Sequence, residues 1–438
     1  MKFRLSILLL PVLAMAVIPG QAQTISSHTT VRHHQEADDS GYVRELGQAE
    51  DSISKKDYTS AEKTLLEVTG KDANNYRAWF DLAFVYNATG RQPEAIEAYR
   101  KSVAANPQIF ESTLNLGIML ARAGDPEAEK YLRAATQLKP SSQENEGWYR
   151  AWMMLGEVLE KSKPQDAVEA FQNAAKLEPK EAEPHFAAGR LLEEAKQYPQ
   201  AAAEFQKAVE LDPKSTEALA GLVNANSKAG QFGAAEASLR KLIALEPDNA
   251  VAHVQLGRVL AAQKKWDEAT AELEKGLKLQ PGDLEAERQL ASIYLDQNKF
   301  DEAAPHIEIA LKAAPSDPEL HHWLGQVYLT QKKFAEAQTE LVTALKLKPD
   351  LGPAYGDLAF VAEQNKNYVL VVKALDARAQ FLPEIPMTYF LRATAYDHLE
   401  DPKQAAANYH KFLEVADGRF PDQEWQAKHR LIAIEPKK

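Results

Sequence analysis

The chain contains no cysteine among its 438 residues. Without a thiol it can form no disulfide, hold no Cys-ligated zinc or iron–sulfur centre and use no Cys nucleophile. Exported eukaryotic chains of this length usually contain cysteine, because oxidising compartments allow disulfides to form. If the chain is exported, the absence of cysteine therefore favours a bacterial periplasmic or secreted protein.

Basic residues are outnumbered, with 51 Lys and Arg against 63 Asp and Glu, and the formal net charge is −12. Phosphate backbones and anionic lipid headgroups repel such a surface. The basic pairs Lys264-Lys265 and Lys332-Lys333 are too short to form a nucleic-acid-binding stripe. The composition predicts a chain with a packed core and no nucleic-acid partner.

A long apolar run occurs only at the start of the chain. Lys2 and Arg4 precede an apolar stretch over residues 5–18, and small residues lead up to Ala22. The stretch is shorter than the roughly 20 residues that a membrane-spanning helix needs. This three-part pattern predicts a secretory signal peptide over residues 1–22 and an exported, periplasmic or secreted chain. No cysteine follows, so a bacterial lipid anchor is excluded.

Residues 23–41 are polar and lack periodic apolar positions, which predicts a flexible arm. The arm contains His28, His33 and His34. Nothing in this segment would hold the three rings in the tetrahedral geometry of a strong metal site. We therefore predict a solvated tail, and no metal or cofactor.

The rest of the chain repeats with a period of 34 residues. The length alone suggests about three globular domains, but the period predicts one array of repeats instead. The period is marked by Pro179, Pro213, Pro247, Pro281, Pro315, Pro349 and Pro383. It predicts eleven repeats within residues 42–419, with a six-residue insertion at 143–148. The repeats are 42–75, 76–109, 110–142, 149–181, 182–215, 216–249, 250–283, 284–317, 318–351, 352–385 and 386–419.

Equivalent positions of the repeats carry the same kind of residue. Position 8 is small in ten repeats, position 20 is alanine in ten, and position 24 is always large. Apolar residues recur at spacings of three and four, as at Leu256 and Leu260, which is helical periodicity. Each repeat is therefore expected to be a helical hairpin, with positions 8 and 20 facing each other where the two helices approach. Stacked hairpins share one continuous core.

These positions resemble the tetratricopeptide repeat family. The second repeat, for example, has Trp79, Leu82, Ala83, Tyr86 and Ala95 where the family has Trp, Leu, Gly, Tyr and Ala. The resemblance implies an all-α fold, a right-handed α-solenoid or superhelix of stacked helix-turn-helix units. It also implies that the inner face, lined mainly by the first helix of each repeat, binds peptides or partner helices.

Carried over by position, the resemblance places positions 2, 5, 9, 12 and 13 of each repeat in this groove. The predicted partner-binding residues are Phe80, Phe84, Asn87, Leu114, Ile118, Met153, Glu157, Phe186, Arg190, Asn224, Phe360 and Phe390. The Lys and Asn pair with which some members bind chaperone tails is absent from positions 5 and 9. Within the second and third repeats, the apolar residues either anchor a partner segment or simply pack between neighbouring first helices.

Residues 420–438 follow the last repeat and are expected to form a capping helix and a tail. Asp422 can serve as the N-cap. Trp425, Leu431 and Ile432 would then cover the exposed end of the stack.

Signals of catalysis are weak. Ser52 and Lys55 have the Ser-x-x-Lys spacing of penicillin-recognising enzymes, but the companion motifs are missing. His185, His253 and His321 all occupy position 4, two repeats apart. At that separation, about 30 Å, they cannot share a metal ion, so we expect semi-buried packing residues.

Three classes of function remain open. The first is a non-enzymatic protein-interaction scaffold of the bacterial cell envelope. The second is an accessory subunit of an envelope assembly or polysaccharide-export machine. The third, an enzyme with an unrecognised site, has little room outside the repeats.

Overall fold

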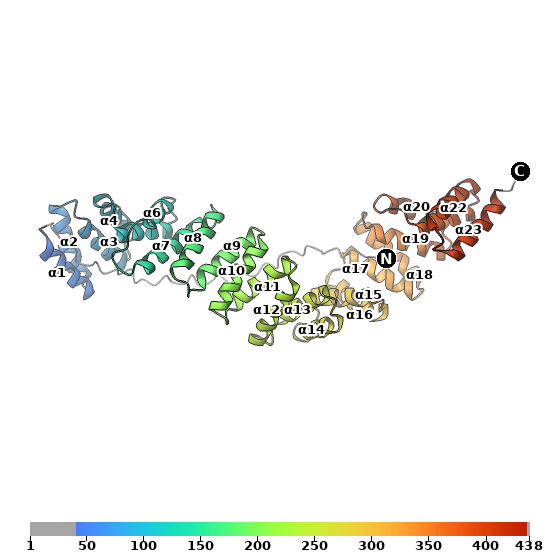
Figure 1. Ribbon diagram of the computed structural model, residues 1–438, viewed down its shortest axis with the longest axis horizontal. Helices are drawn as coiled ribbons and strands as arrows, with labels where there is room; N and C mark the ends of the chain where they lie inside the picture. Colours follow the sequence, from blue (N-terminus) through green and yellow to red (C-terminus); the bar gives the residue numbers. More distant parts are fainter. Residues whose placement is uncertain (1–40, 436–438) are drawn as a thin grey trace. The chain divides into compact units, whose positions relative to one another are not determined.

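The computed structural model describes residues 41–435, which form 23 α-helices and no strand (Figure 1). The chain divides between Gly221 and Leu222 into two compact parts, which we describe separately. The first part holds α1 Val43–Ser54, α2 Tyr58–Lys71, α3 Tyr76–Ala88, α4 Gln92–Ala105, α5 Phe110–Arg122, α6 Ala128–Ala135, α7 Glu144–Leu159, α8 Pro164–Leu177, α9 Glu183–Glu194 and α10 Tyr198–Leu211. Helix α11, Thr216–Lys228, spans the division.

The second part continues with twelve further helices. They are α12 Phe232–Leu245, α13 Ala250–Ala262, α14 Trp266–Leu279, α15 Leu284–Asp296, α16 Phe300–Ala313, α17 Pro318–Thr330, α18 Phe334–Leu347, α19 Gly352–Gln364, α20 Tyr368–Ala379, α21 Pro386–His398, α22 Pro402–Ala416 and α23 Pro421–Ile434. Two helices fall within each predicted repeat, and consecutive helices pack as stacked hairpins within each part. The predicted all-α solenoid of helix-turn-helix units is confirmed. The number of repeats, eleven, stays a prediction.

Several predicted segments lie outside the described residues. The signal peptide over 1–22, the arm up to residue 40 and the last three residues of the tail are among them. Export of the chain therefore stays an expectation from the sequence.

The last residue of a repeat starts the next first helix. Asn75, at position 34, accepts a hydrogen bond from the backbone N–H of Ala78, and Asn249 and Asp283 cap α13 and α15 in the same way. Such a side chain satisfies one of the amides that a helix N-terminus leaves without a partner. Position 34 is thus a helix start signal in several repeats, although Ile109 and Leu351 at this position make no side-chain cap.

The turn inside each hairpin depends on one left-handed residue. Position 15 has a positive φ in ten repeats, and it is glycine at Gly90, Gly124 and Gly230 but lysine at, for example, Lys264 and Lys332. The fourth repeat, one residue short, has no left-handed residue between α7 and α8. The turn closes because a hydrogen bond runs back from residue 16, as from Lys265 N–H to the Leu260 carbonyl at 2.9 Å.

Small residues at position 8 lie beneath the large residue at position 24. A methyl group added at Gly257 would lie 2.5 Å from Leu273 Cγ and 3.0 Å from the carbonyl oxygen of Ala269. Gly325 stands in the same relation to Leu341, at 2.8 Å. We predicted that positions 8 and 20 face each other. Position 20 contributes only its backbone here, and the closest side chain is that of position 24.

Position 4 links each first helix to the chain that precedes it. The ring N–H of Trp79 donates to the carbonyl oxygen of Ala73, six residues earlier, at 2.8 Å. Tyr355 makes the equivalent bond to Pro349 through its hydroxyl, and the Nε2 atoms of His253 and His321 lie at the same place. Position 4 therefore favours an aromatic side chain with a hydrogen-bond donor, because the carbonyl oxygen that follows a helix end needs a donor.

The insertion and the C-terminal helix differ from simple repeats. Residues 144–148 of the insertion add to the start of α7, and Trp148 Nε1 donates to the Leu138 carbonyl at 2.7 Å. At the other end, α23 buries Ala427 and Leu431. The prediction that Trp425 and Ile432 cover the stack is wrong. They are 61% and 72% exposed, because they lie off the buried face.

The predicted N-cap of α23 is also wrong. The helix begins at Pro421, with Phe420 at the N-cap, so Asp422 lies within the first turn. There its charge still favours the helix N-terminus, without capping it.

Candidate functional site

First helices of neighbouring repeats lie closer together than second helices do. Helix α1 contacts α3 and α5 contacts α7 in the first part, and α13, α17 and α19 each contact the next first helix in the second part. Over residues 41–435, no two second helices of neighbouring repeats make a contact of similar extent. We call the surface formed by positions 2, 5, 9 and 12 of the first helices the first-helix face. All the predicted partner-binding residues belong to it.

The apolar residues predicted on α3 and α5 are mostly buried. Phe80 packs edge-on against Tyr99 at 5.7 Å between ring centroids, and Leu114 and Ile118 belong to a helix that is buried from Phe110 to Leu120. The prediction that these three residues are free anchors on the surface is therefore corrected. Helix α5 is covered because α4, α6 and α7 all pack on it. Burial is what the packing alternative expects.

Other predicted residues of the first part remain within reach of solvent. Phe84 and Asn87 on α3 and Phe186 and Arg190 on α9 are half-buried. Glu157 on α7 is exposed. These five residues carry the predicted site in the first part.

Met153 and Phe186 contribute mainly to the packing of their own hairpins. Met153 is buried within α7. The half-buried ring of Phe186 lies 5.8 Å from that of Phe205 on α10. Most of their apolar surface is thus buried against other residues of the chain.

The remaining three predicted residues belong to the second part. Asn224 on α11 and Phe360 on α19 are exposed, whereas Phe390 on α21 is buried. The Phe390 ring packs against Tyr409 and Phe412, at 6.2 and 5.1 Å. The prediction that Phe390 binds a partner is also corrected, because its ring is buried in the aromatic core of the last hairpin. The roles of Asn224 and Phe360 in binding stay predictions, as do those of the five residues of the first part that reach solvent.

Carboxylates gather on the first-helix face of α7 and α9. Although Glu157 is exposed as a residue, partial desolvation of its carboxyl group, followed by repulsion from Glu183 and Glu160, raises its pKa to about 6. Among the described residues Glu157 has neither a hydrogen bond nor an ion pair. Arg190 bonds to Glu160 and, at 2.9 Å, to Glu194, so the local cation is already occupied. The face keeps an excess of negative charge.

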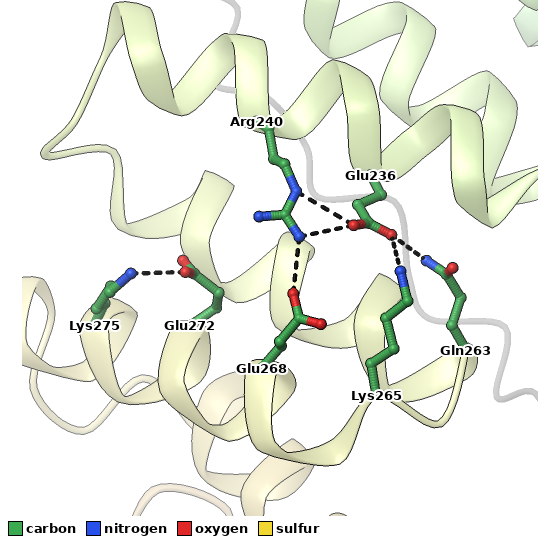
Figure 2. Close-up of polar contacts among 7 residues, drawn as sticks. All are labelled: Glu236, Arg240, Gln263, Lys265, Glu268, Glu272 and Lys275. Atoms are coloured by element: carbon green, nitrogen blue, oxygen red, sulfur yellow. Dashed lines mark hydrogen bonds and ion pairs between the residues drawn. The ribbon is translucent and has the colours of Figure 1, made fainter.

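Some charges of the second helices are, in contrast, paired between repeats. Figure 2 shows Glu236 of α12 accepting from Arg240 at 2.7 Å and from Lys265 and Gln263 of the next repeat at 2.8 Å. Arg240 also donates to Glu268 at 2.9 Å. Hydrogen bonds from Lys265 first, and from Arg240, lower the pKa of Glu236 to about 2. These contacts hold one repeat against the next.

The same ladder recurs in the first part. Lys163 Nζ lies 2.7 Å from Glu129, and Arg133 donates to Asp166 at 2.6 Å. Because these charges are satisfied within the chain, they are poor candidates for binding a partner. Glu157 on the first-helix face, in contrast, has no such partner among the described residues.

Four histidines have a carboxylate partner nineteen residues away, which their positions taken singly did not predict. The pairs are His185–Glu204, His253–Glu272, His306–Glu287 and His321–Glu340, with N–O distances of 2.6 to 2.7 Å. The sequence carried a signal for them: position 23 holds Ala98 opposite Trp79, but an acid opposite each position-4 histidine. The pairs bind helix to helix and are not metal sites.

Other kinds of site were also sought in the described part of the chain. No group of three His, Asp or Glu side chains there comes close enough to hold a metal ion. None of the helices in residues 41–435 has the length and apolar content needed to cross a bilayer. A shallow, open depression is lined by Glu246, Pro247, Asp248 and Asn249, in the link between α12 and α13.

Solved structures of repeat proteins are similar to this chain. YrrB, a TPR protein described as having an unusual peptide-binding site, is 24% identical, with a TM-score of 0.38; the match covers 43% of this chain and 96% of YrrB. Cut9 in the APC/C hetero-tetramer Cut9-Hcn1 is 14% identical over 88% of this chain and 97% of that one, with a TM-score of 0.40. MamA from Desulfovibrio magneticus RS-1 is 20% identical over 38% and 96%, with a TM-score of 0.36.

Comparison with curated proteins finds no match. Two family models, both described as tetratricopeptide repeat, do match. One covers residues 46–108, 93–143, 157–216 and 288–354, and the other covers residues 192–241 and 226–293. Since these matches span more than half of the chain, with the hairpins of the fold beneath them, the chain belongs to the tetratricopeptide repeat family.

Proposed function

We propose that the chain is a non-enzymatic protein-interaction scaffold, exported to the bacterial cell envelope, that holds a segment of a partner protein on its first-helix face. Proteins of this family generally mediate protein–protein interactions, and stacked repeats offer an extended surface for them. Export rests on the pattern of residues 1–22.

The uncompensated charge of Glu157 is the observation that carries the choice of face. The carboxyl group of Glu157 is repelled by Glu183 and Glu160 and has no hydrogen bond or ion pair in residues 41–435, so it adds no attraction between its own helices. Glu236 and Glu129 on the second helices differ from Glu157, because each is paired with a basic residue of the next repeat and so holds two repeats together. A partner that approaches Glu157 relieves the repulsion among Glu157, Glu183 and Glu160.

A capture experiment from a bacterial envelope extract tests the face. The bait is the whole mature chain, and Glu157→Lys is compared with Glu169→Lys, a charge reversal on the exposed side of α8 in the same hairpin. We expect Glu157→Lys to lose the partner and Glu169→Lys to keep it. Equal capture by both variants, with unchanged thermal unfolding, would contradict the proposed face.

The same experiment separates the scaffold from the alternative. Several partners in unequal amounts support a general scaffold, whereas one stoichiometric partner supports an accessory subunit of an envelope assembly or polysaccharide-export machine. Phe84→Asp tests the apolar anchor, because Phe84 is the half-buried member of that group. Retained capture and stability in this variant would remove Phe84 from the site.

Export is checked separately. The mature chain recovered from the producing cell is expected to begin at Gln23, as measured by mass spectrometry of its N-terminal peptide. A chain that keeps residues 1–22 and stays in the cytoplasm would contradict the envelope part of the proposal.

A further inference from the structure

The C-terminal helix α23 carries the two most exposed large apolar side chains of residues 41–435. Ile432 is 72% exposed and Trp425 is 61% exposed, whereas Ala427 and Leu431 of the same helix are buried. Single apolar residues on a surface need no explanation, but these two stand seven residues apart and so share one face of the helix. This face points away from α22, against which Ala427 and Leu431 pack.

Helix α23 has the register of a first helix. Ala427 and Leu431 are four residues apart and buried, as are the residues at positions 3 and 7 of the repeats, for example Ala286 and Leu290. In this register Ile432 stands at position 8, which faces the second helix of a complete repeat. The exposed face of α23 is therefore the side on which complete repeats carry their second helix.

Positions 1 and 4 belong to the same side of a first helix. In the seventh repeat, a methyl group added at Gly276 of α14 would lie 3.3 Å from the carbonyl oxygen of Ala250, at position 1. His253, at position 4, bonds to a glutamate of the same second helix. In α23 these two positions are Trp425 and Lys428.

A second helix of the usual kind does not fit on this side of α23. Position 8 is small in ten of the predicted repeats, because the large residue at position 24 lies directly over it. A methyl group at Gly257, for example, would lie 2.5 Å from Leu273 Cγ, and the side chain of Ile432 is larger still. The face therefore favours a helix that approaches at Trp425 instead.

Two charged residues flank Trp425 on this face. Asp422 stands three residues before it and Lys428 three residues after it, and both are exposed. Within residues 41–435 the side chain of neither makes an ion pair or a hydrogen bond. Arg430, on the side towards the repeats, is in contrast held by Asp397 at 2.6 Å. The face thus carries an acid, a tryptophan and a base at equal spacing.

We propose that two copies of the chain associate through α23, with the two helices antiparallel about a twofold axis that passes beside Trp425. The two Trp425 rings then meet at the axis. Asp422 of each copy faces Lys428 of the other, because both residues lie at the same distance from Trp425. A contact of this kind uses one patch twice, so the patch must be complementary to itself.

Self-complementarity is the reason for choosing a second copy as the occupant. A parallel pair of α23 helices would bring Asp422 against Asp422 and Lys428 against Lys428, whereas the antiparallel pair matches opposite charges twice. Ile432, two turns after Trp425, extends the apolar face. The first-helix face stays open in this dimer, so the inference goes beyond the proposed function and does not depend on it.

The contact is small, and the dimer is expected to be weak. Two helices of 14 residues that meet along one face bury less than the roughly 800 Å² per copy of a standard interface. An exposed indole is, however, the kind of side chain that carries most of the binding energy in an interface. We expect a dissociation constant of roughly 1–100 μM.

Sedimentation velocity of the whole mature chain, over roughly 1–300 μM, tests the dimer. The wild type should convert from monomer to dimer in this range. Trp425→Ala should weaken association at least about 10-fold, since tryptophan is a typical centre of an interface. The control is Val369→Ala on α20, which removes another exposed apolar side chain and should change nothing. Thermal unfolding checks that both variants are folded.

Charge reversal tests the antiparallel pairing. Asp422→Lys and Lys428→Asp each place like charges at both contacts and should weaken self-association roughly 5- to 30-fold. A mixture of the two variants restores opposite charges at both contacts and should dimerise as tightly as the wild type. Because the mixture contains the same two proteins, a loss of stability in either cannot produce this rescue.

Three results would overturn the inference. The first is a monomer at every concentration. The second is a dimer that Trp425→Ala does not weaken, and the third is a mixture that associates no more tightly than its components. Glu157→Lys, on the first-helix face, should dimerise like the wild type. Each of these results leaves the proposed function standing, because capture of a partner is measured separately.

Discussion

The Nδ1 atom of His253 lies 2.6 Å from a carboxylate oxygen of Glu272, while its Nε2 lies 3.1 Å from the carbonyl oxygen of Pro247. Both oxygens are hydrogen-bond acceptors, so each ring nitrogen faces an acceptor. Burial tends to raise the pKa of Glu272, but hydrogen bonds from Lys275 and His253 outweigh it and the pKa is lowered. The His253 ring thus joins two helices and the preceding link.

The His253–Glu272 pair can be replaced by the Trp and Ala pair that stands at the same positions in the second repeat. His253→Trp alone places a larger ring against Glu272 and should lose about 1–3 kcal/mol of unfolding free energy. Combined with Glu272→Ala, it recreates the Trp79 and Ala98 arrangement and should return to within about 1 kcal/mol of the wild type. Urea unfolding of both single variants and the double variant measures the coupling. Purely additive losses would show that the two positions do not act as a pair.

Gly257 is required where α13 meets α14. Gly257→Ala brings a methyl group to 2.5 Å from Leu273 Cγ and 3.0 Å from a backbone oxygen, so we expect a loss of about 1–3 kcal/mol by chemical denaturation. Gly233→Ala in α12 is the control, because nothing lies within 4 Å of the new methyl group. It should be neutral or stabilise by up to about 1 kcal/mol. Similar effects of the two changes would refute the steric reason.

The ion pairs around Glu236 should matter most above acid pH. Its pKa falls from 4.5 to about 2 on folding, so the stabilisation is present above the ordinary glutamate pKa and disappears as the pH falls towards 2. Glu236→Gln should therefore cost about 1–3 kcal/mol at pH 7 and progressively less below pH 4, measured by urea unfolding across this range. Glu274→Gln, at an exposed position of α14, is the control. A cost for Glu236→Gln that is the same at both ends of the range would argue against the ion pairs.

The left-handed turn gives a prediction that depends on the backbone alone. Gly90 has a φ of 79°, and no atom lies within 4 Å of a methyl group added there. Gly90→Ala should still cost about 1–2 kcal/mol, because a Cβ atom disfavours this conformation. Lys332→Gly, at the equivalent position with a φ of 57°, should stabilise slightly or be neutral. Thermal unfolding distinguishes them, and stabilisation by Gly90→Ala would be the contrary result.

Much of the fold could be predicted because the same residue pattern occurs in each repeat. Alanine at position 20 and a large residue at position 24 recur through the repeats, a cap at position 34 recurs in several of them, as at Asn75 and Asp317, and the hairpins follow from local spacing. The site was harder to predict. Position alone placed Phe80 and Leu114 on a surface, but their burial depends on how tightly the helices around α5 close on them.

The histidine pairs were predictable in principle, since residues nineteen apart change together between repeats. The burial of Asp81 was not, because an acidic residue on a helix is usually exposed. Only the packing around α3 shows that it is 6% exposed.

The sequence by itself determined the helical hairpins, their turns and their period, because helix propensity, caps and left-handed turns act over a few neighbouring residues. The tertiary structure alone decided which charges are paired, which aromatic rings are covered and which buried polar atoms lack partners. These properties depend on distances between helices, which the packing of side chains from different repeats sets to within an ångström.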